Sequence, residues 1–343
     1  MEFATREENS RPSWQALADG VRPTAQSRDG ADPGNFPHGW QYHASDVLEQ
    51  HEFHNLLGTL RAGISASGDV ARLRSCSGPW ASTWLCICPT SPGLVFQNFE
   101  LLVSLRFRLG LSIPRELAQR CEACRQLLDL RGYHRITCTR SARLHTRHKG
   151  LIRAWLQIFA EAGAAVPRRN VERMLRDTPV PVPAGDQRRL DMVVSGTGLF
   201  RGLPLLCDVF CVSPITGLGR ARSGCLTVNG GAAESAARRC RETDYPEVDK
   251  SGVAKLCALG VEIFGRWGQE TIDIVNGLIQ ERCVGLPQRI RVASSQRLSR
   301  RWWGLLGLAT QRIVVQAIFR SASADLPCEL SEPFPAPADW IVS

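Results

Sequence analysis

The chain has 343 residues, of which 43% are hydrophobic. This content excludes a largely disordered protein, because so many apolar residues can form a buried core, and the length suggests about two structural units. The formal net charge is +9, and a basic chain favours polyanions such as nucleic acid as partners. The lysines are only Lys149, Lys250 and Lys255, so the excess is arginine, a skew that can also follow from the nucleotide composition of the gene.

Thirteen cysteines fit either a disulfide scaffold or an intracellular protein with metal-bound and free thiols. Residues 1–20 are polar, carry mixed charge and lack the apolar stretch of a secretory signal. No apolar run reaches the roughly 18 residues that a membrane span needs. We therefore expect an intracellular protein, nuclear or cytoplasmic, with reduced thiols.

The chain reads as six consecutive segments. Residues 1–36 are polar and aperiodic, which predicts disorder. Apolar residues at helical spacing then predict a helical region, and the later segments are a Cys/His motif, a main domain, a long helix and a Pro-rich tail. The boundaries that we predict for these five segments are 37–115, 116–143, 144–285, 290–325 and 326–343.

The main domain shows an order of helix, strand, strand, helix, strand. An amphipathic helix ends at Gly163, with Leu151, Trp155 and Ile158 on one face. Segments rich in β-branched or apolar residues predict the strands. The strands are expected at 188–196, 205–214 and 255–265, and the helices after the first two strands at 231–243, 269–283 and 296–322.

Four residues have the spacing of a zinc site, C-x2-C-x9-H-x3-C. A short turn can present the first pair, and a tetrahedral zinc needs four nitrogen or sulfur donors. All four positions are filled, so the zinc would be structural. A cysteine-rich chain can also produce such a pair by accident, as Cys86 and Cys88 illustrate. The predicted ligands are Cys121, Cys124, His134 and Cys138.

Asp191 and Asp208 each interrupt an apolar strand pattern. A buried carboxylate is costly unless it is paired or binds a metal, and two acids on adjacent strands would suit Mg²⁺. Either residue could equally lie in solvent at the end of a strand. The pattern alone leaves both interpretations open.

Several short sequence segments resemble those of a known class of proteins. These segments are HGWQYHAS, RLRS, WASTWL, GDQRRLDMVV, LLCDVFCVSP, GRWG and SRRWWGLL. Over roughly 35–320 the chain is similar to the restriction-endonuclease-like, PD-(D/E)xK end of non-LTR (LINE-type) retrotransposon polyproteins, especially retroelement-derived proteins of dinoflagellates. The resemblance implies an α/β (α+β) core after a small zinc knuckle, with flanking helices. No YxDD-type reverse-transcriptase palm is present, so the chain cannot copy RNA by itself.

The resemblance implies Mg²⁺-dependent cleavage of DNA, with Asp191 and Asp208 as magnesium ligands and RNA as a second possible partner. The motif's lysine would stand two residues after the second acid, where this chain has Phe210. The retroelement variant carries it on the next helix, and that position here is Cys240. Catalysis is therefore expected to be impaired, and the rival interpretations are an inactive zinc-containing nucleic-acid-binding module or a nonfunctional relic. The expected nucleic-acid contacts are Arg188, Arg189, Arg239 and Arg241.

Other polar and aromatic residues have two interpretations each. Glu172 could be the acid that this fold often carries near its first helix, but a solvated surface residue is the simpler interpretation. His145 and His148 could contact phosphate or metal, although a basic start of a helix is simpler. Trp302 and Trp303 could stack on bases, but the apolar run after them favours the core.

Overall fold

The computed structural model describes residues 40–62, 66–90, 92–113, 120–140, 143–167, 171–227 and 230–319. The predictions of disorder over 1–36 and of a tail over 326–343 lie outside these residues. The chain divides into two compact units, 1–66 and 67–343. The first unit contributes one described helix, α3 (Trp40–Ala62), within the predicted helical region.

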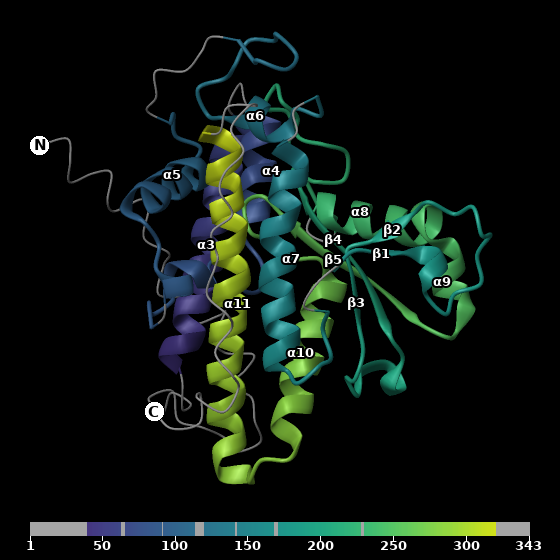
Figure 1. Ribbon diagram of the computed structural model, residues 1–343. Helices are drawn as coiled ribbons and strands as arrows, with labels where there is room; N and C mark the ends of the chain where they lie inside the picture. The colour runs from purple at the N-terminus through teal and green to yellow at the C-terminus, as the bar shows by residue number, and fades with distance from the viewer. Residues whose placement is uncertain are drawn as a thin grey trace, which may run out of the picture. The chain divides into compact units, whose positions relative to one another are not determined.

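A three-stranded mixed sheet lies at the centre of the second unit (Figure 1). Strand β4 (Leu205–Val212) pairs antiparallel with β3 (Met192–Val194) and parallel with β5 (Lys255–Glu262). Two short strands, β1 (Arg173–Met174) and β2 (Arg189–Leu190), form a separate antiparallel pair. Most residues of β4 and β5 are apolar because both faces of these strands are covered.

Helices cover the sheet and pack on one another. The parallel pair of β4 and β5 requires a crossover, which contains helix α8 (Ala232–Arg239), the π-helical segment Cys240–Asp244 and helix α9 (Pro246–Ser251). Short 3-10 turns lie at Thr83–Leu85, Pro92–Leu94, Leu175–Asp177 and Leu199–Gly202. The helices after α3 are α4 (Ala66–Cys76), α5 (Asn98–Leu109), α6 (Tyr133–Thr137), α7 (Arg143–Glu161), α8 (Ala232–Arg239), α9 (Pro246–Ser251), α10 (Gln269–Val284) and α11 (Gln288–Phe319).

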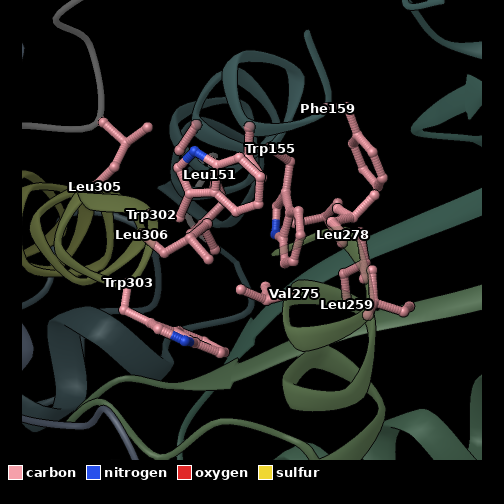
Figure 2. Packing of buried hydrophobic residues seen from close by; sticks show 14 of the residues in the cluster. Leu151, Trp155, Phe159, Leu259, Val275, Leu278, Trp302, Trp303, Leu305 and Leu306 are labelled. Carbon is pink, nitrogen blue, oxygen red and sulfur yellow. The ribbon is translucent and has the colours of Figure 1, made fainter. Parts of the chain in front are cut away.

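The largest core cluster lies between α7, α10, α11 and the sheet (Figure 2). Trp155 of α7 and Trp302 of α11 point into it, together with Val275 and Leu278 of α10. Trp302 and Trp303 are both fully buried. Their assignment to the core, which the sequence favoured over base stacking, is therefore confirmed.

The structure shows a mixed α/β fold, as predicted. The segments of the second unit are not separate bodies, because α11 packs along α5, α6, α7 and α10 and ties them together. Helix α11 begins at Gln288, eight residues before the predicted start at 296. Its first turns carry mostly exposed residues, so the apolar spacing that reveals the rest of the helix is missing there.

Helices α7 and α11 approach closely at Gly150. A β-carbon added to Gly150 would lie 2.4 Å from the Cγ2 atom of Ile313, a buried β-branched residue on α11. The stiff isoleucine side chain cannot swing aside, so the absence of a side chain at 150 sets the distance between the helices.

We predict that Gly150→Ala lowers the free energy of unfolding by about 1–3 kcal/mol, because overpacking outweighs the ~1 kcal/mol that alanine usually contributes in a helix. Urea denaturation followed by circular dichroism measures the change. Lys149→Ala, on the exposed side of the same helix, is the control and should change little. An alanine variant more stable than the parent would contradict the close packing.

Candidate functional site

The Cys/His motif forms a compact cluster of donor atoms. The Sγ atom of Cys124 lies 3.1 Å from Nε2 of His134, and the Sγ atoms of Cys121 and Cys138 are 3.9 Å apart. All four donor atoms lie within 4.8 Å of one another. Tetrahedral zinc with bonds of ~2.0–2.3 Å places its ligand atoms about 3.3–3.8 Å apart. The cluster could therefore hold a metal ion such as zinc.

Local hydrogen bonds position these ligands. The amide of Arg125 donates to the carbonyl of Cys121 at 2.8 Å, which closes the turn, and Arg125 adopts a left-handed φ of 64°. The carboxylate of Asp129 accepts the amides of Tyr133 and His134, at 3.0 and 2.7 Å. Asp129 thus satisfies open donors at the start of α6 and orients a predicted ligand.

The electrostatics of the cluster favour a metal-binding thiolate. Burial raises the pKa of Cys121, but hydrogen bonds from the amides of Cys124 and Ala123 and from His134 outweigh it and lower the pKa to about 6. Because the thiolate is the form that binds metal, Cys121 is prepared for this role at neutral pH. Burial raises the pKa of the Cys138 thiol instead.

The two predicted acids lie side by side, although only Asp208 is on a strand. Asp191 lies between β2 and β3, and its amide donates to the carbonyl of Cys207 at 3.1 Å. Its Oδ2 atom accepts the amide of Val209 at 2.6 Å. Asp208 is on β4, and its carboxyl group interacts with that of Asp191 through hydrogen bonding and charge. The structure therefore brings the carboxylates together.

Burial, followed by the negative charge of Asp191, raises the pKa of Asp208 to about 7. His148 of α7 contacts the pair, with its Nε2 atom 2.5 Å from Oδ1 of Asp191. Burial lowers the pKa of His148, but the hydrogen bond and charge of Asp191 outweigh it, so the net shift is upward. The site thus contains two carboxyl groups and an imidazole that favours its charged form.

Cys240 faces the acid pair, with its Sγ atom 3.5 Å from Oδ2 of Asp208. The residue is buried at a widened helical turn, the π-helical segment Cys240–Asp244 that follows α8. The amide of Tyr245 donates to the carbonyl of Cys240 at 2.8 Å and closes this turn. Burial and the charge of Asp208 raise the pKa of the Cys240 thiol, so the group is neutral.

The arginines predicted to bind nucleic acid fall into two pairs. Arg188 binds the carboxylates of Asp186 and Glu247, and Arg241 binds Glu270, so these two guanidinium groups are already used inside the protein. Arg189 and Arg239 remain exposed, with side-chain accessibilities of 67% and 74%.

Glu172 is largely exposed and pairs with Arg189 at 3.6 Å, which fits the simpler interpretation of a surface residue. With Val171 and Met174 these two residues line a hollow of about 480 Å³. Phe210, two residues after Asp208, packs its ring against Gly260 and supplies no cation. The side chain of His145 lies outside the described residues.

Sequence reasoning underrated His148. Its signal is positional, because His148 precedes Leu151 by three residues and Trp155 by seven, which places all three on one helical face. A polar residue on the buried face of a helix is expected to have a hydrogen-bonding partner, and here the partner is Asp191. The identity of this partner could not be read from the sequence, because Asp191 is 43 residues away along the chain.

No family model and no curated protein matches this sequence. Among the described residues, no helix is long and apolar enough to cross a membrane. In the same part of the chain, Cys121, Cys124, His134 and Cys138 form the one group of three or more suitable side chains that could share a metal ion.

We predict that the purified protein carries one zinc per chain. Cys124→Ser should lose it, and Asp129→Ala should weaken binding roughly 10- to 100-fold, because loss of a residue that orients a ligand typically has this effect. Elemental analysis and competition with a chromophoric chelator measure both. Cys86→Ser, which changes an exposed cysteine, is the control. Equal metal loss in the Cys86 variant would contradict the assignment.

We predict that Asp208→Asn stabilises the fold at pH 8. The raised pKa means that Asp208 loses its proton near 3.8 in the unfolded chain but near 7 in the fold. Its contribution to stability is therefore lost as the pH rises from about 4 to about 7, to the extent of about 2–4 kcal/mol. Urea denaturation at pH 4.5 and pH 8 should show the gain only at pH 8. An equal difference at both values would refute the shift.

Proposed function

We propose that the chain is a retroelement-derived, divalent-cation-dependent endonuclease whose site is Asp191 and Asp208, with slow catalysis because the lysine is missing. The observation that carries the proposal is the pair formed by the partly buried Asp208 of β4 and the buried Asp191, which directly precedes the paired strand β3. Two adjacent carboxylates with a raised pKa destabilise the folded state, and such pairs are typical of functional sites.

The arrangement of elements supports the resemblance. Helix α7, the strands up to β4, helix α8 and strand β5 follow the order of the restriction-endonuclease-like core. The first acid lies beside the antiparallel partner of the strand that carries the second acid. The next helical turn presents Cys240 to Asp208 at 3.5 Å, where the retroelement variant would have its lysine.

The residues fit a hard cation. Asp191 and Asp208 offer oxygen donors, which Mg²⁺ and Mn²⁺ prefer, and deprotonated Asp208 gains from a nearby cation because burial penalises its charge. A bound cation would polarise the phosphate and lower the pKa of the attacking water. The chain's own groups hold the carboxylates in place, since His148 and the amide of Val209 each bind one oxygen of Asp191.

The reaction would be hydrolysis of a phosphodiester. The oxygen of water forms a bond to phosphorus, the bond from phosphorus to the leaving sugar oxygen breaks, and that oxygen takes up a proton. His148 offsets part of the negative charge at the acids, whereas the neutral thiol of Cys240 offsets none. The absence of a positive charge at residue 240 is the observation that supports a second candidate function, an inactive nucleic-acid-binding module that retains the Cys/His cluster.

We predict slow nicking of supercoiled plasmid by the parent protein in Mg²⁺ or Mn²⁺, and none by Asp208→Ala. Cys240→Lys should raise the rate at least roughly tenfold, because a positioned cationic group commonly contributes ~10²–10⁴-fold. Gel electrophoresis of nicked and closed circles measures the rate.

Cys240→Met is the matched control, because it fills the same space without charge and should not accelerate cleavage. Rapid cleavage by the parent that does not depend on residue 240 would show that another group supplies the cation. No gain in the lysine variant, with its fold intact by circular dichroism, would favour the binding module.

A further inference from the structure

A short hairpin follows β4, the strand that carries Asp208. We call it the 214–222 hairpin. Its arms are joined by the bridge between Ile215 and Ala221. The amide of Thr216 donates to the carbonyl of Arg220 at 2.7 Å, and the amide of Gly219 donates back to Thr216 at 3.0 Å. Gly219 has a left-handed φ of 76°, which closes a tight turn. Leu218 lies at the tip.

The hairpin packs against α6, the helix that carries His134, and against α4. A β-carbon on Gly217 would lie 2.9 Å from Oγ1 of Thr137 on α6, and one on Gly219 would lie 3.5 Å from the ring of Tyr133. On the α4 side, a β-carbon on Gly68 would overlap the carbonyl oxygen of Gly219 at 1.7 Å. The backbone of the hairpin therefore packs against side chains of α6 and against the backbone of α4.

The tip of this rigid hairpin is apolar and its flanks are basic. Leu218 is 81% exposed, the highest value among the exposed large hydrophobic side chains of the described residues. Arg220 and Arg222 are also exposed. A single exposed leucine is ordinary on a flexible loop. Here the backbone around it is ordered before any partner binds, which lowers the entropic cost of association.

We propose that the 214–222 hairpin is a contact surface for duplex DNA, in which Arg220 and Arg222 bind phosphates and Leu218 packs against sugars and base edges in a groove. A two-stranded ribbon fits the major groove, and apolar side chains at protein tips contact bases in many DNA complexes. The net charge of +9 favours this partner over an apolar protein surface.

The inference rests on the proposed function and extends it to the way the substrate is held. Ten residues separate Asp208 from Leu218, which span at most roughly 34 Å at about 3.4 Å per residue. A duplex of about ten base pairs has the same length. One duplex can therefore reach the acid pair and the hairpin together. The Cys/His cluster would support this binding indirectly, because α6 carries His134 and packs against the hairpin.

Binding of a fluorescein-labelled 30-base-pair duplex to the full chain tests the inference. Anisotropy is measured without Mg²⁺, to prevent cleavage, and without chelator, to keep the zinc. Leu218→Ala should weaken binding roughly 3- to 10-fold, because part of one aliphatic side chain is no longer buried, with the salt dependence unchanged. Arg220→Ala with Arg222→Ala should weaken binding and reduce the salt slope by about 1–2.

The control substitutions are placed in the first turn of α11, at the end of this helix that is far from the hairpin and α6. Helix α6 packs at Gly132 against Ile318, in the last turn of α11, whereas Arg289 and Ile290 are in its first turn. A helix of 32 residues is about 48 Å long. Arg289→Ala and Ile290→Ala remove exposed side chains of the same kinds and should leave duplex binding unchanged.

The outcomes separate the two proposals. Hairpin variants that bind the duplex as the parent does, while the parent nicks plasmid, would overturn the hairpin inference and leave the endonuclease standing. Hairpin-dependent binding by a chain that never nicks would support the inference and refute the endonuclease. No binding of duplex by the parent would overturn both.

Discussion

The partly buried carboxyl group of Asp208, in the middle of β4, is the constraint on which the rest of the site depends. At Asp208, β4 pairs with Ala258 of β5, and on the other side the amide of Asp191 donates to the carbonyl of Cys207, so the backbone holds the carboxyl group in place. Burial and the charge of Asp191 raise its pKa to about 7. The large hydrophobic cluster with Trp155 and Trp302, to which Leu205, Cys207 and Val209 of the same strand contribute, stabilises the fold against this cost.

Three neighbouring elements contact the pair formed by Asp191 and Asp208. Helix α7 brings His148 to Asp191, and the hydrogen bond and charge of Asp191 raise the pKa of His148 despite its burial. The strand that carries Asp191 is interrupted at that residue, which lets its carboxylate accept the amide of Val209. The π-helical turn brings Cys240 within 3.5 Å of Asp208. π-helical turns are rare and often occur at functional sites.

The Cys/His cluster and the acid pair belong to one structural unit. The segment 120–140 is too short to form a core of its own, and it joins the unit through the packing of Tyr133 on Phe107 and Phe264. α6 in turn supports the 214–222 hairpin, which begins where the strand of Asp208 ends. A metal ion at the cluster would therefore stabilise α6 and, through it, the loop that follows β4.

The sequence by itself determined the elements and the candidate ligands. Apolar runs predicted β4, β5 and α10, because local periodicity decides which face of an element is buried. The spacing of the four Cys/His residues predicted a cluster that the fold assembles, because ligands close in sequence need only a turn and a helix. Two acids within apolar segments identified the pair that meets where β4 passes the start of β3.

Only the tertiary structure decided which groups meet. The contact of His148 with Asp191 joins residues 43 positions apart, and the contact of Cys240 with Asp208 joins residues 32 positions apart. Arg188 and Arg241 form internal ion pairs, although on the sequence they resemble the exposed Arg189 and Arg239. Periodicity records whether a side chain faces the core, but long-range packing chooses its partner, and with it the charge and protonation that determine the chemistry of the site.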